Sequence, residues 1–264
     1  MPEGDTVHKL ARYLAQRLCG QTLTHAHLRD HPEHVLAGRQ VTAVRAHGKH
    51  LFIELDDGRI LRSHLGMTGS WHHYRAAEPW DKPAYQAAIV LQIAAEVFVC
   101  FNPMQTEVLP AGWRAQRTFT TALGPDLLSP EAPFDELPAR ARALLTPATP
   151  LADTLLDQRV AAGIGNVYKS EILFLEGLHP LCPLGQTTDA QLVALYRKAA
   201  ELLHANLGPG PRVTRRKLEA GGPLWVYGRK GMPCLRCATP IVQARLGRHL
   251  RSTYWCPACQ PPCG

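Results

Sequence analysis

The sequence predicts an α+β protein that begins with an amphipathic helix, continues as a β-rich half and ends as a helical half with a cysteine cluster. Three observations predict this fold class. Apolar residues recur at helical spacing over residues 5–18, strand-like runs fill residues 51–101, and helical periodicity returns after Gly124-Pro125. With 264 residues, of which 45% are hydrophobic and 19% charged, the chain can bury a core in each half.

The first predicted element is a helix over residues 5–18. Val7, Leu10, Leu14 and Leu18 recur at the spacing of one helix face. Asp5, or Gly4 before it, is the expected cap, because an aspartate at a helix start accepts hydrogen bonds from unpaired backbone N–H groups.

Two later stretches predict paired strands. Residues 51–65 read LFIELDDGRILRSHL, which predicts two strands around an Asp-Asp-Gly turn. Residues 87–101 read AAIVLQIAAEVFVCF and predict a second hairpin. Together with the first helix these strands predict a β-sandwich or a β-barrel, and we expect one domain over residues 1–125.

The chain changes character after residue 125. Helical periodicity predicts helices over residues 151–163, 166–178 and 188–207. Thr188 and Gln191 have the spacing of a capping box, in which each side chain accepts from the other residue's backbone N–H. We expect a helical domain over residues 126–222.

The strongest motif is a pair of Cys-x-x-Cys sequences, Cys234 with Cys237 and Cys256 with Cys259, separated by 18 residues. Two such pairs flanking a span long enough for a β-hairpin predict a structural zinc site with four thiolate ligands. Zinc binding would supply the folding free energy of residues 223–264, which are too few to bury a core of their own. The alternative is a chance grouping of free thiols.

Four cysteines stand outside this motif. Cys19, Cys100 and Cys182 are scattered, and we expect them to be small buried apolar residues. Cys263 falls outside the metal-ligand spacing and is expected to be a residue of the tail.

The net charge of +7 is concentrated near the C-terminus. From Arg212 to Arg251 ten basic residues accompany a single acid, Glu219, which favours a polyanionic partner with nucleic acid as the first candidate. A solvated basic face is the alternative. The chain lacks an apolar run of the ~20 residues that a membrane helix needs and a secretory signal, so we expect a soluble, cytoplasmic protein.

Two turns carry candidate phosphate contacts. Gly163-Ile164-Gly165-Asn166 lies between helical segments, where Asn166 is expected to cap the next helix and its N–H groups to bind phosphate. Lys49 follows Gly48 directly before a strand, so its ammonium group can reach a phosphate. Both turns also have a purely structural interpretation, as a helix corner and a solvated loop.

The first residues suggest chemistry at the chain end itself. Removal of Met1 would make Pro2 the N-terminal residue, with a secondary amine whose pKa is near ~8. Such an amine can attack an electrophilic sugar carbon and form an iminium, as Schiff-base lysines do. Glu3 could then shuttle protons if burial raised its pKa. The alternative is that Pro2 only stiffens the terminus.

These features occur together, and the sequence resembles the formamidopyrimidine-DNA glycosylase / endonuclease VIII family of bifunctional base-excision repair enzymes. The resemblance runs the length of the chain through MPEG, GKHLF, SHLGMTGSW, LLDQRVAAGIGNVYKSEILF and RSTYWCPACQ. It implies an N-terminal β-sandwich domain, a helix–two-turn–helix domain and a zinc finger. It also implies excision of an oxidised base followed by strand cleavage through β,δ-elimination.

The resemblance assigns catalytic roles by position. Pro2 corresponds to the nucleophile that attacks C1′, and Glu3 to the acid/base that assists sugar ring opening. Lys49 corresponds to the turn lysine that contacts phosphate and helps catalysis. Arg251 corresponds to the finger arginine that grips the phosphates flanking the lesion.

Two further positions correspond to DNA contacts. Asn166 matches the phosphate-binding asparagine, and Met67 matches an intercalating position that fills the space of a flipped base, with ordinary core packing as the alternative. The implied partner is double-stranded DNA with oxidised bases or abasic sites. The implied protein is a monomer with one structural zinc ion, associated with the nucleoid in a bacterium.

Departures from the family pattern bear on the substrate. The chain starts PEGDT, closer to the endonuclease VIII branch than the PELPE of the purine branch, although Thr6 replaces that branch's common glutamate. Asn102-Pro103 is followed by Met104-Gln105 where the purine branch has an arginine and an aromatic wedge, and Met104 or Gln105 could substitute.

These departures favour oxidised pyrimidines as substrates. The alternatives are a formamidopyrimidine/8-oxoguanine glycosylase and a non-catalytic zinc-ribbon protein that binds damaged DNA.

Overall fold

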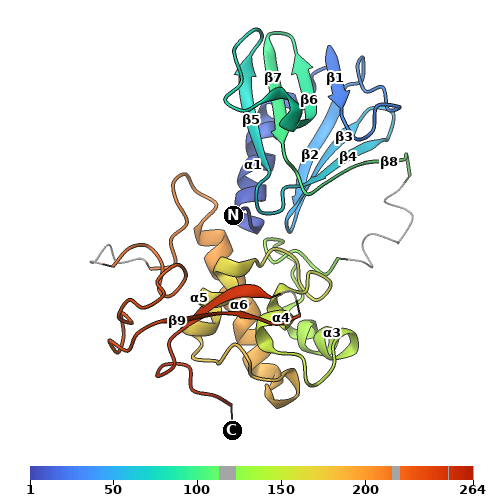
Figure 1. Ribbon diagram of the computed structural model, residues 1–264. Coiled ribbons are helices and arrows are strands. Elements are labelled where there is room, and N and C mark those ends of the chain that lie inside the picture. The colour runs from blue at the N-terminus through green and yellow to red at the C-terminus, as the bar shows by residue number, and fades with distance from the viewer. Residues whose placement is uncertain (113–122, 216–220, 249, 264) are drawn as a thin grey trace. The chain divides into compact units, whose positions relative to one another are not determined.

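The computed structural model describes residues 1–112, 123–215, 221–248 and 250–263. The chain divides into two compact units, Met1–Thr120 and Thr121–Gly264 (Figure 1). The second unit holds the helical segment and the cysteine-rich segment together, so the predicted boundary between residues 222 and 223 stays a prediction. Among the described residues, no helix is long and apolar enough to cross a membrane.

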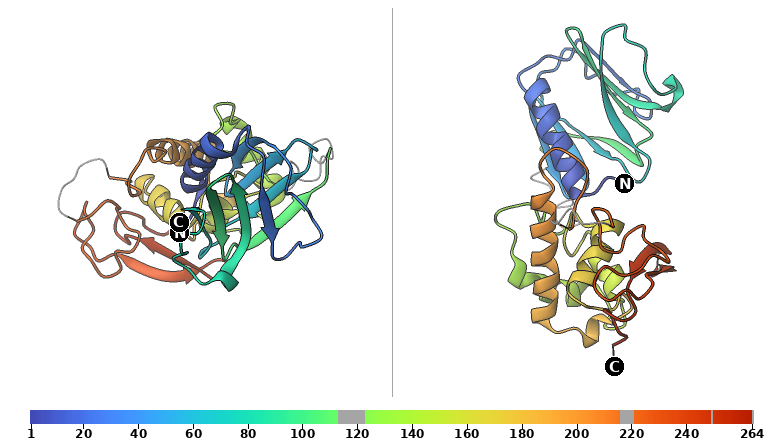
Figure 2. Two further views of the ribbon diagram at one scale, coloured as in Figure 1. Left: turned by 90° about the horizontal axis from the view of Figure 1, so that it is seen from above. Right: turned by 90° about the vertical axis from the view of Figure 1, so that its left-hand side faces the viewer.

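The first unit is a β-sandwich with one long helix packed on it (Figures 1 and 2). Its strands form two four-stranded antiparallel sheets, ordered β1-β6-β7-β5 and β2-β3-β4-β8. The elements are α1 (Gly4–Leu18), β1 (His25–Leu28), β2 (Val41–His47), β3 (His50–Leu55), β4 (Ile60–His64), β5 (Ser70–Arg75), the 3-10 turn η1 (Ala84–Gln86), β6 (Ala87–Ile93), β7 (Glu96–Phe101) and β8 (Gln105–Leu109). Two separate sheets decide the open question in favour of a sandwich over a barrel.

Helix α1 confirms the predicted helix but corrects its cap. Glu3 is the N-cap residue with extended backbone, and no side chain of the described residues caps the helix. Asp5 lies instead in the first turn, where its charge complements the positive end of the helix dipole. The apolar face buries Val7, Leu14 and Leu18 to 1% exposure or less. Each such side chain contributes about 1.5–3 kcal/mol to folding.

Both predicted hairpins are present. In the first, β3 pairs with β4 from His50↔His64 to Glu54↔Ile60, and the Asp-Asp-Gly turn lies between them. Gly58 in this turn has φ +81°, a conformation that favours glycine. In the second, β6 pairs with β7 up to Ile93↔Glu96. The two hairpins lie in different sheets, so their apolar sides meet in one core.

The second unit consists of several short helices, one long helix, α6 (Asp189–Ala205), and a two-stranded hairpin (Figures 1 and 2). Its elements are η3 (Phe134–Glu136), α3 (Leu137–Leu144), α4 (Leu151–Leu156), α5 (Asn166–Leu175), η4 (Leu184–Gln186), α6 (Asp189–Ala205), β9 (Val242–Leu246) and β10 (Arg251–Trp255). Helices α3, α4, α5 and α6 enclose one apolar core, and β10 packs on α5.

Helix lengths in this unit correct one prediction. Residues 151–163 are helical only as far as Leu156, because Asp157 leaves the helix and its carboxylate accepts a 2.9 Å hydrogen bond from the backbone N–H of Arg159. The capping box of Thr188 and Gln191 is confirmed, with both reciprocal hydrogen bonds present at the start of α6.

The scattered cysteines differ from expectation. Cys100 is buried as predicted, and burial raises the pKa of its thiol. Cys19 is exposed because it follows the last turn of α1 at the surface. Cys182 and the tail residue Cys263 form a disulfide. This pairing could not be expected from sequence, since 81 residues separate the two cysteines.

Candidate functional site

The four motif cysteines converge at the base of the β9–β10 hairpin. Their Sγ atoms all lie within 4.8 Å of one another. Three of the separations are 3.4 Å for Cys237–Cys256, 3.5 Å for Cys237–Cys259 and 3.9 Å for Cys234–Cys259. A tetrahedral zinc ion with bonds of about 2.3 Å separates its ligands by about 3.8 Å. The cluster therefore fits one metal ion, and its four thiolates would leave no open coordination position.

Backbone N–H groups support the thiolates. Arg236 N–H donates to Cys234 Sγ at 3.4 Å, and Cys259 N–H donates to Cys256 Sγ at 3.5 Å. Such bonds stabilise the negative charge that a thiolate ligand carries. The donor set of four soft sulfurs is the one that zinc prefers in structural sites.

The hairpin is anchored to α5 by a buried lysine that the sequence reasoning missed. Lys169 is fully buried, and its Nζ donates to Thr253 Oγ1 at 2.8 Å and to Ser252 O at 3.1 Å. Both partners lie on β10, directly after Arg251. The signal available in the sequence was a lysine in a helical segment that continues into the apolar run Ile172–Leu175.

A buried glutamate on the same helix anchors the segment that enters the finger. The carboxylate of Glu171 accepts hydrogen bonds of 2.8–2.9 Å from the backbone N–H groups of Trp225, Val226 and Tyr227. The hydroxyl of Thr214 also donates to it. A buried carboxylate with several donors fixes the path of the chain, because leaving it unpaired would be costly.

The Gly-Ile-Gly-Asn turn is held by Gln158, a second residue that the sequence reasoning missed. Its Oε1 accepts from Gly163 N–H at 3.0 Å, and its Nε2 donates to Ile164 O at 3.1 Å. Gly163 has φ +122°, which a side chain would strain. Gln158 thus fixes the backbone that leads into α5.

Asn166 differs in detail from the prediction. It is the first residue of α5 and is 6% exposed, whereas Gly165 is the N-cap residue and no side chain in the described part of the chain caps the helix. Its predicted place at a helix N-terminus is therefore correct, but its predicted capping role is wrong. The first turn of a helix directs backbone N–H groups outward along the axis, which suits an anion.

Arg251 is exposed at the first residue of β10, opposite Leu246. Arg245 and Arg248 are exposed on the same hairpin. The tip of the hairpin is fixed to α4, because Arg248 N–H donates to the Asp153 carboxylate at 2.8 Å. The hairpin therefore carries three exposed arginines on a fixed backbone, within the basic segment that the sequence indicated. Of the wider basic run, Arg216, Lys217 and the acid Glu219 lie outside the described residues.

The chain end lies directly on α1. Pro2 is half-buried, while the side chain of Glu3 is fully buried at the N-cap position. The backbone carbonyl of Glu3 accepts from Val7 N–H at 3.1 Å, which begins the helix. A terminus fixed in this way is unusual, because chain ends are commonly frayed.

Lys49 lies in the tight turn between β2 and β3, as predicted, and is half-buried. Gly48 beside it has φ +55°. The neighbouring strand residues His50 and His64 face each other with ring centroids 4.6 Å apart. Burial, the partner imidazole and the nearby Arg62 lower the pKa of His50 to about 2. Burial, then Lys49 and Arg62, lower the pKa of His64 to about 4. The charge at this turn is thus carried by cations beside neutral imidazoles.

Two exposed methionines lie in loops that flank strands of the second sheet and of its neighbour. Met67 is 59% exposed in the β4–β5 loop, and Met104 is 66% exposed just before β8. Gly66, the residue before Met67, packs closely on Met104, because a Cβ at this position would lie 2.7 Å from Met104 Cβ. The backbone N–H of Met104 donates to His64 O at 2.9 Å. The alternative interpretation of Met67 as a core residue is excluded by its exposure.

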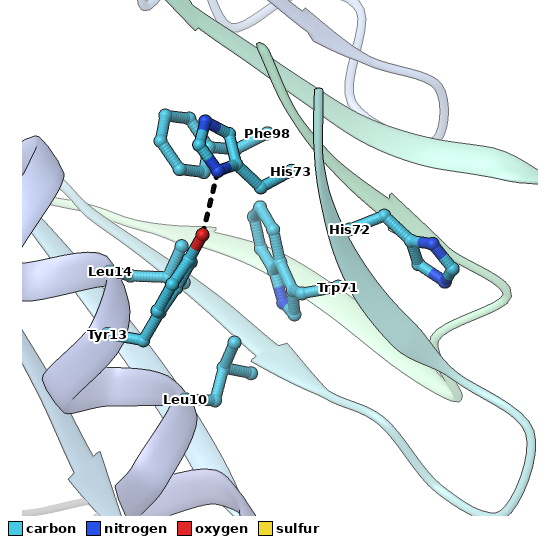
Figure 3. A pocket seen from close by; sticks show the side chains of 7 residues that line it. All are labelled: Leu10, Tyr13, Leu14, Trp71, His72, His73 and Phe98. Carbon is cyan, nitrogen blue, oxygen red and sulfur yellow. Dashed lines mark hydrogen bonds between the residues drawn. The ribbon is translucent and has the colours of Figure 1, made fainter. Parts of the chain in front are cut away.

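A small pocket of about 300 Å³ lies between α1 and β5 (Figure 3). Its lining residues are Leu10, Tyr13, Leu14, Trp71, His72, His73 and Phe98. The ring of His73 stacks on Phe98, and its Nδ1 shares a 2.7 Å hydrogen bond with the Tyr13 hydroxyl. Nε2 of His73 lies 3.0 Å from the Glu96 carboxylate. This chain of polar contacts fixes α1, which carries Pro2 and Glu3, to β5 and β7.

The structure brings the predicted residues together in part. The four cysteines form one cluster, and Asn166 and Arg251 lie on two elements, α5 and β10, that Lys169 joins. Pro2, Glu3, Lys49 and Met67 all belong to the first unit. The first unit is a β-sandwich that α1 precedes in the sequence, and the second is a helical unit with a four-cysteine finger. This combination defines the helix–two-turn–helix class of DNA glycosylase folds.

Sequence comparison makes the assignment more specific. Residues 1–106 match the formamidopyrimidine-DNA glycosylase N-terminal domain, and residues 123–216 match the formamidopyrimidine-DNA glycosylase H2TH domain. The chain belongs to the formamidopyrimidine-DNA glycosylase / endonuclease VIII family, as its sequence motifs predicted.

Three relatives illustrate the range of the family. The chain is 39% identical to the probable endonuclease 8 2 of Streptomyces coelicolor, covering 98% of this chain and 94% of that protein. It is 39% identical to the DNA-(apurinic or apyrimidinic site) lyase Nei2 of Mycolicibacterium smegmatis, covering 98% and 99%. It is 32% identical to the formamidopyrimidine-DNA glycosylase of Methylococcus capsulatus, covering 98% and 100%.

Solved structures confirm the fold. The complex of Lactococcus lactis Fpg with DNA that contains an abasic site has a TM-score of 0.83, at 22% identity, covering 99% of this chain and 100% of that one. The complex of the wild-type form of the same protein with DNA that contains N7-benzyl-Fapy-dG also has a TM-score of 0.83, at 23% identity and with the same coverage.

Proposed function

We propose that this protein is a bifunctional DNA glycosylase and abasic-site lyase of base-excision repair. The observation that carries the proposal is the structure of the N-terminus. Pro2 leads directly into α1, and Glu3 beside it is fully buried at the N-cap position. A buried acid next to a potential secondary amine is the combination that an imine-forming reaction requires. The relatives named as endonuclease 8 and as a DNA lyase support the same activity.

In the proposed reaction, removal of Met1 exposes the Pro2 amine. Its nitrogen attacks C1′ of the damaged nucleotide, the bond to the base breaks, and an iminium forms between enzyme and sugar. Glu3 donates a proton to the ring oxygen as the sugar opens and accepts protons in later steps. Elimination of the 3′ phosphate and then of the 5′ phosphate leaves a gap of a single nucleotide.

The remaining site residues would bind and deform the DNA. We assign phosphate contacts to Lys49, to Asn166 at the start of α5 and to Arg251 on the fixed hairpin. Guanidinium and ammonium groups on fixed elements bind phosphate with little loss of side-chain freedom. We assign Met67 to the space that a flipped base leaves, because an exposed unbranched apolar side chain can enter a base stack.

We propose oxidised pyrimidines as the preferred substrates, in duplex DNA. The PEGDT start and the Asn102-Pro103-Met104 sequence, which lacks an arginine and aromatic wedge, favour this choice. The two relatives at 39% identity are named as endonuclease 8 and as Nei2, whereas the Methylococcus glycosylase is at 32%. An oxidised-purine glycosylase is the alternative within the family.

The proposal also covers the metal ion, the oligomeric state, the cellular location and the domain boundaries. The cluster of Cys234, Cys237, Cys256 and Cys259 would hold one zinc ion, whose binding stabilises the fold of the finger and takes no part in the reaction. We expect a monomer in the bacterial cytoplasm, associated with the nucleoid through its basic hairpin. We also propose functional boundaries after residues 125 and 222.

A borohydride trapping experiment tests the proposal. The purified protein, shown by mass spectrometry to lack Met1, is incubated with duplexes that contain thymine glycol, 8-oxoguanine or an abasic site, and sodium borohydride is added. We expect a reduced covalent adduct at Pro2 with each reactive duplex, formed faster with thymine glycol than with 8-oxoguanine. The opposite ranking would identify the purine branch.

A matched control changes only the amine. Two residues placed before Pro2 convert its nitrogen to an amide and leave the rest of the chain intact, so this protein should bind the abasic duplex but form no adduct. Glu3→Gln should retain binding and lose excision by at least about 100-fold. The lack of an adduct on every duplex would contradict the enzymatic function and favour a binding protein.

A further inference from the structure

We propose that Cys182 and Cys263 form a reversible oxidative modification site, and that their disulfide holds the metal-binding finger on the helical segment. The proposal concerns the second unit alone and does not depend on glycosylase activity. It assigns a function to two cysteines that neither the metal cluster nor the proposed reaction uses.

The two residues are placed for a disulfide. They are bonded in the structure, with Cα atoms 5.5 Å apart, although 81 residues separate them in the sequence. A separation of this size is in the ordinary range for disulfides, so the backbone needs no rearrangement to form the bond. The bond closes a loop that contains α6 and the whole finger. Such a long loop is the case in which a disulfide restricts the unfolded chain most.

Cys182 lies on a fixed part of the helical segment. Its carbonyl accepts a 2.9 Å hydrogen bond from Leu151 N–H at the start of α4, and its own N–H donates to His179 O at 3.0 Å. Its side chain is 4% exposed. The sulfur of Cys182 is therefore shielded from solvent and held by the α4 scaffold.

Cys263 lies four residues after the metal ligand Cys259, on a short tail that is itself fixed. Gln260 is fully buried, and its Nε2 donates to Leu178 O at 2.8 Å while its Oε1 accepts from Cys256 N–H at 3.0 Å. The two prolines that follow restrict the tail further. Gln260 thus joins the second Cys-x-x-Cys turn to the loop that ends at Cys182.

Exposure determines which sulfur reacts first. Cys263 is half-buried, whereas Cys182 is shielded, so an oxidant reaches the Cys263 thiolate first. That thiolate attacks one oxygen of a peroxide, the O–O bond breaks, and a sulfenic acid forms with release of hydroxide. The Cys182 thiolate then attacks the sulfenic sulfur, forming the S–S bond and releasing a second hydroxide. The two thiols lose two electrons and two protons, and the peroxide is reduced to two water molecules.

The reverse step uses an external dithiol. Its thiolate attacks the more accessible sulfur, Cys263, and Cys182 leaves as thiolate. A second thiolate of the dithiol resolves the mixed disulfide and frees Cys263. The site is therefore reversible with reagents of two chemical classes, peroxides and dithiols.

We expect the disulfide to affect how fast the four-cysteine cluster releases its metal ion. Release of the metal requires Cys256 and Cys259 to move away from the other two ligands. A disulfide four residues beyond Cys259 limits that movement, because the tail is then covalently joined to the α4 scaffold. Metal binding and folding of a finger are coupled, so a restraint on unfolding slows metal loss. The disulfide would protect the finger when oxidant concentrations are high.

The experiment compares oxidised and reduced full-length protein loaded with zinc. After mild treatment with hydrogen peroxide, peptide mapping without reduction should give one cross-linked peptide pair that contains Cys182 and Cys263, and dithiothreitol should remove it. Zinc transfer to a chromogenic chelator should then be at least about threefold slower from the oxidised protein than from the reduced protein.

Cys263→Ser is the main variant, because serine replaces one sulfur atom by oxygen and leaves the half-buried tail otherwise unchanged. Treated with peroxide, it should release zinc at the rate of the reduced wild-type protein. Cys19→Ser, which removes an exposed free thiol of the first unit, should behave as wild type. The proposal is overturned by the absence of the Cys182–Cys263 peptide, by pairing of Cys263 with a metal ligand, or by equal zinc release from oxidised wild type and Cys263→Ser.

Discussion

The ammonium group of Lys169 donates a 2.8 Å hydrogen bond to the hydroxyl of Thr253, and both side chains are fully buried. Lys169 follows Asn166 by one helical turn, and Thr253 follows Arg251 by two residues on β10. The Thr253 hydroxyl in turn donates to the carbonyl of Arg251 at 3.1 Å. The two proposed phosphate contacts of the second unit are therefore joined by a buried polar link. Arg251 gains a fixed backbone, which a bidentate contact to phosphate requires.

Lys169→Met should weaken DNA binding without removing a DNA contact. Methionine keeps most of the side-chain volume but loses the charged donor, so β10 is held less firmly. We expect about a tenfold loss of affinity for an abasic duplex, measured by fluorescence anisotropy, because a hydrogen bond from a charged group contributes about 1.5–3 kcal/mol. Lys198→Met, on the surface of α6, should change the affinity less than about twofold.

A double-mutant cycle with Arg251→Ala tests whether Lys169 affects DNA binding through Arg251. Arg251→Ala alone should weaken binding and reduce the salt slope by about one. If Lys169 acts by positioning Arg251, the double variant should bind no more weakly than Arg251→Ala. Additive losses would show that Lys169 acts on another part of the finger.

The exposed methionines should matter only where a base stack must be opened. Met67→Ala should slow excision from duplex DNA at least about tenfold, because the hole left by a flipped base is then unfilled. Excision of the same lesion from a single strand should change little. Met104→Ala should show the same division if Met104 is a second wedge.

Met232→Ala is the matched control for this pair, since Met232 is 51% exposed on the second unit. It should leave both substrates unaffected. Equal losses on duplex and single-stranded DNA would assign Met67 a role in catalysis or folding in place of a wedge.

Local patterns predicted most of the regular structure. Strand-like apolar runs separated by turn residues indicated the β3–β4 and β6–β7 hairpins, and the helical spacing after Gly4 indicated α1, because these patterns depend on neighbours along the chain. The metal cluster could also be predicted, since thiolate spacing is itself a local signal. Helix α4 was overestimated, because Asp157 ends it through a contact with its own backbone neighbours.

Long-range partnerships could not be predicted. The roles of Lys169 and Glu171 depend on β10 and on residues 225–227, and no spacing rule relates these segments to α5. The Cys182–Cys263 disulfide was missed for the same reason. Polar residues in a helical segment that continues into an apolar run were the one available signal, because a buried charge needs a partner.

The half-buried imidazoles of His50 and His64 should make the first unit sensitive to acid. In the unfolded chain both take up a proton near pH 6.5, whereas the folded protein holds their pKa values at about 2 and about 4. Above pH 6.5 both states are neutral, and these groups do not affect stability. As the pH falls below 6.5 the unfolded state binds more protons, so stability decreases by at most about 1.4 kcal/mol per pH unit for each histidine.

Urea denaturation between pH 7.5 and 4.5 measures this effect. His64→Gln should reduce the loss of stability over this range, whereas His204→Gln, on the last turn of α6, should leave it unchanged. An identical pH dependence in wild type and His64→Gln would show that this imidazole is protonated in the folded protein.

The contact between Tyr13 and His73 should stabilise the helix that carries the proposed reagent. Nδ1 of His73 shares a 2.7 Å hydrogen bond with the Tyr13 hydroxyl, and Nε2 of the same ring lies 3.0 Å from the Glu96 carboxylate. Tyr13→Phe removes one hydrogen bond and keeps the ring in the pocket of Figure 3. We expect a loss of about 0.5–1 kcal/mol in the free energy of unfolding, measured by urea denaturation.

Tyr85→Phe is the control for this change, because Tyr85 is 75% exposed in the same unit, and its loss should stay within about 0.5 kcal/mol. Borohydride trapping adds a second measurement. If α1 positions Pro2, Tyr13→Phe should slow adduct formation while abasic duplex binding is kept, since α1 is then held less firmly at β5. Unchanged trapping together with lowered stability would restrict the Tyr13–His73 contact to a role in folding.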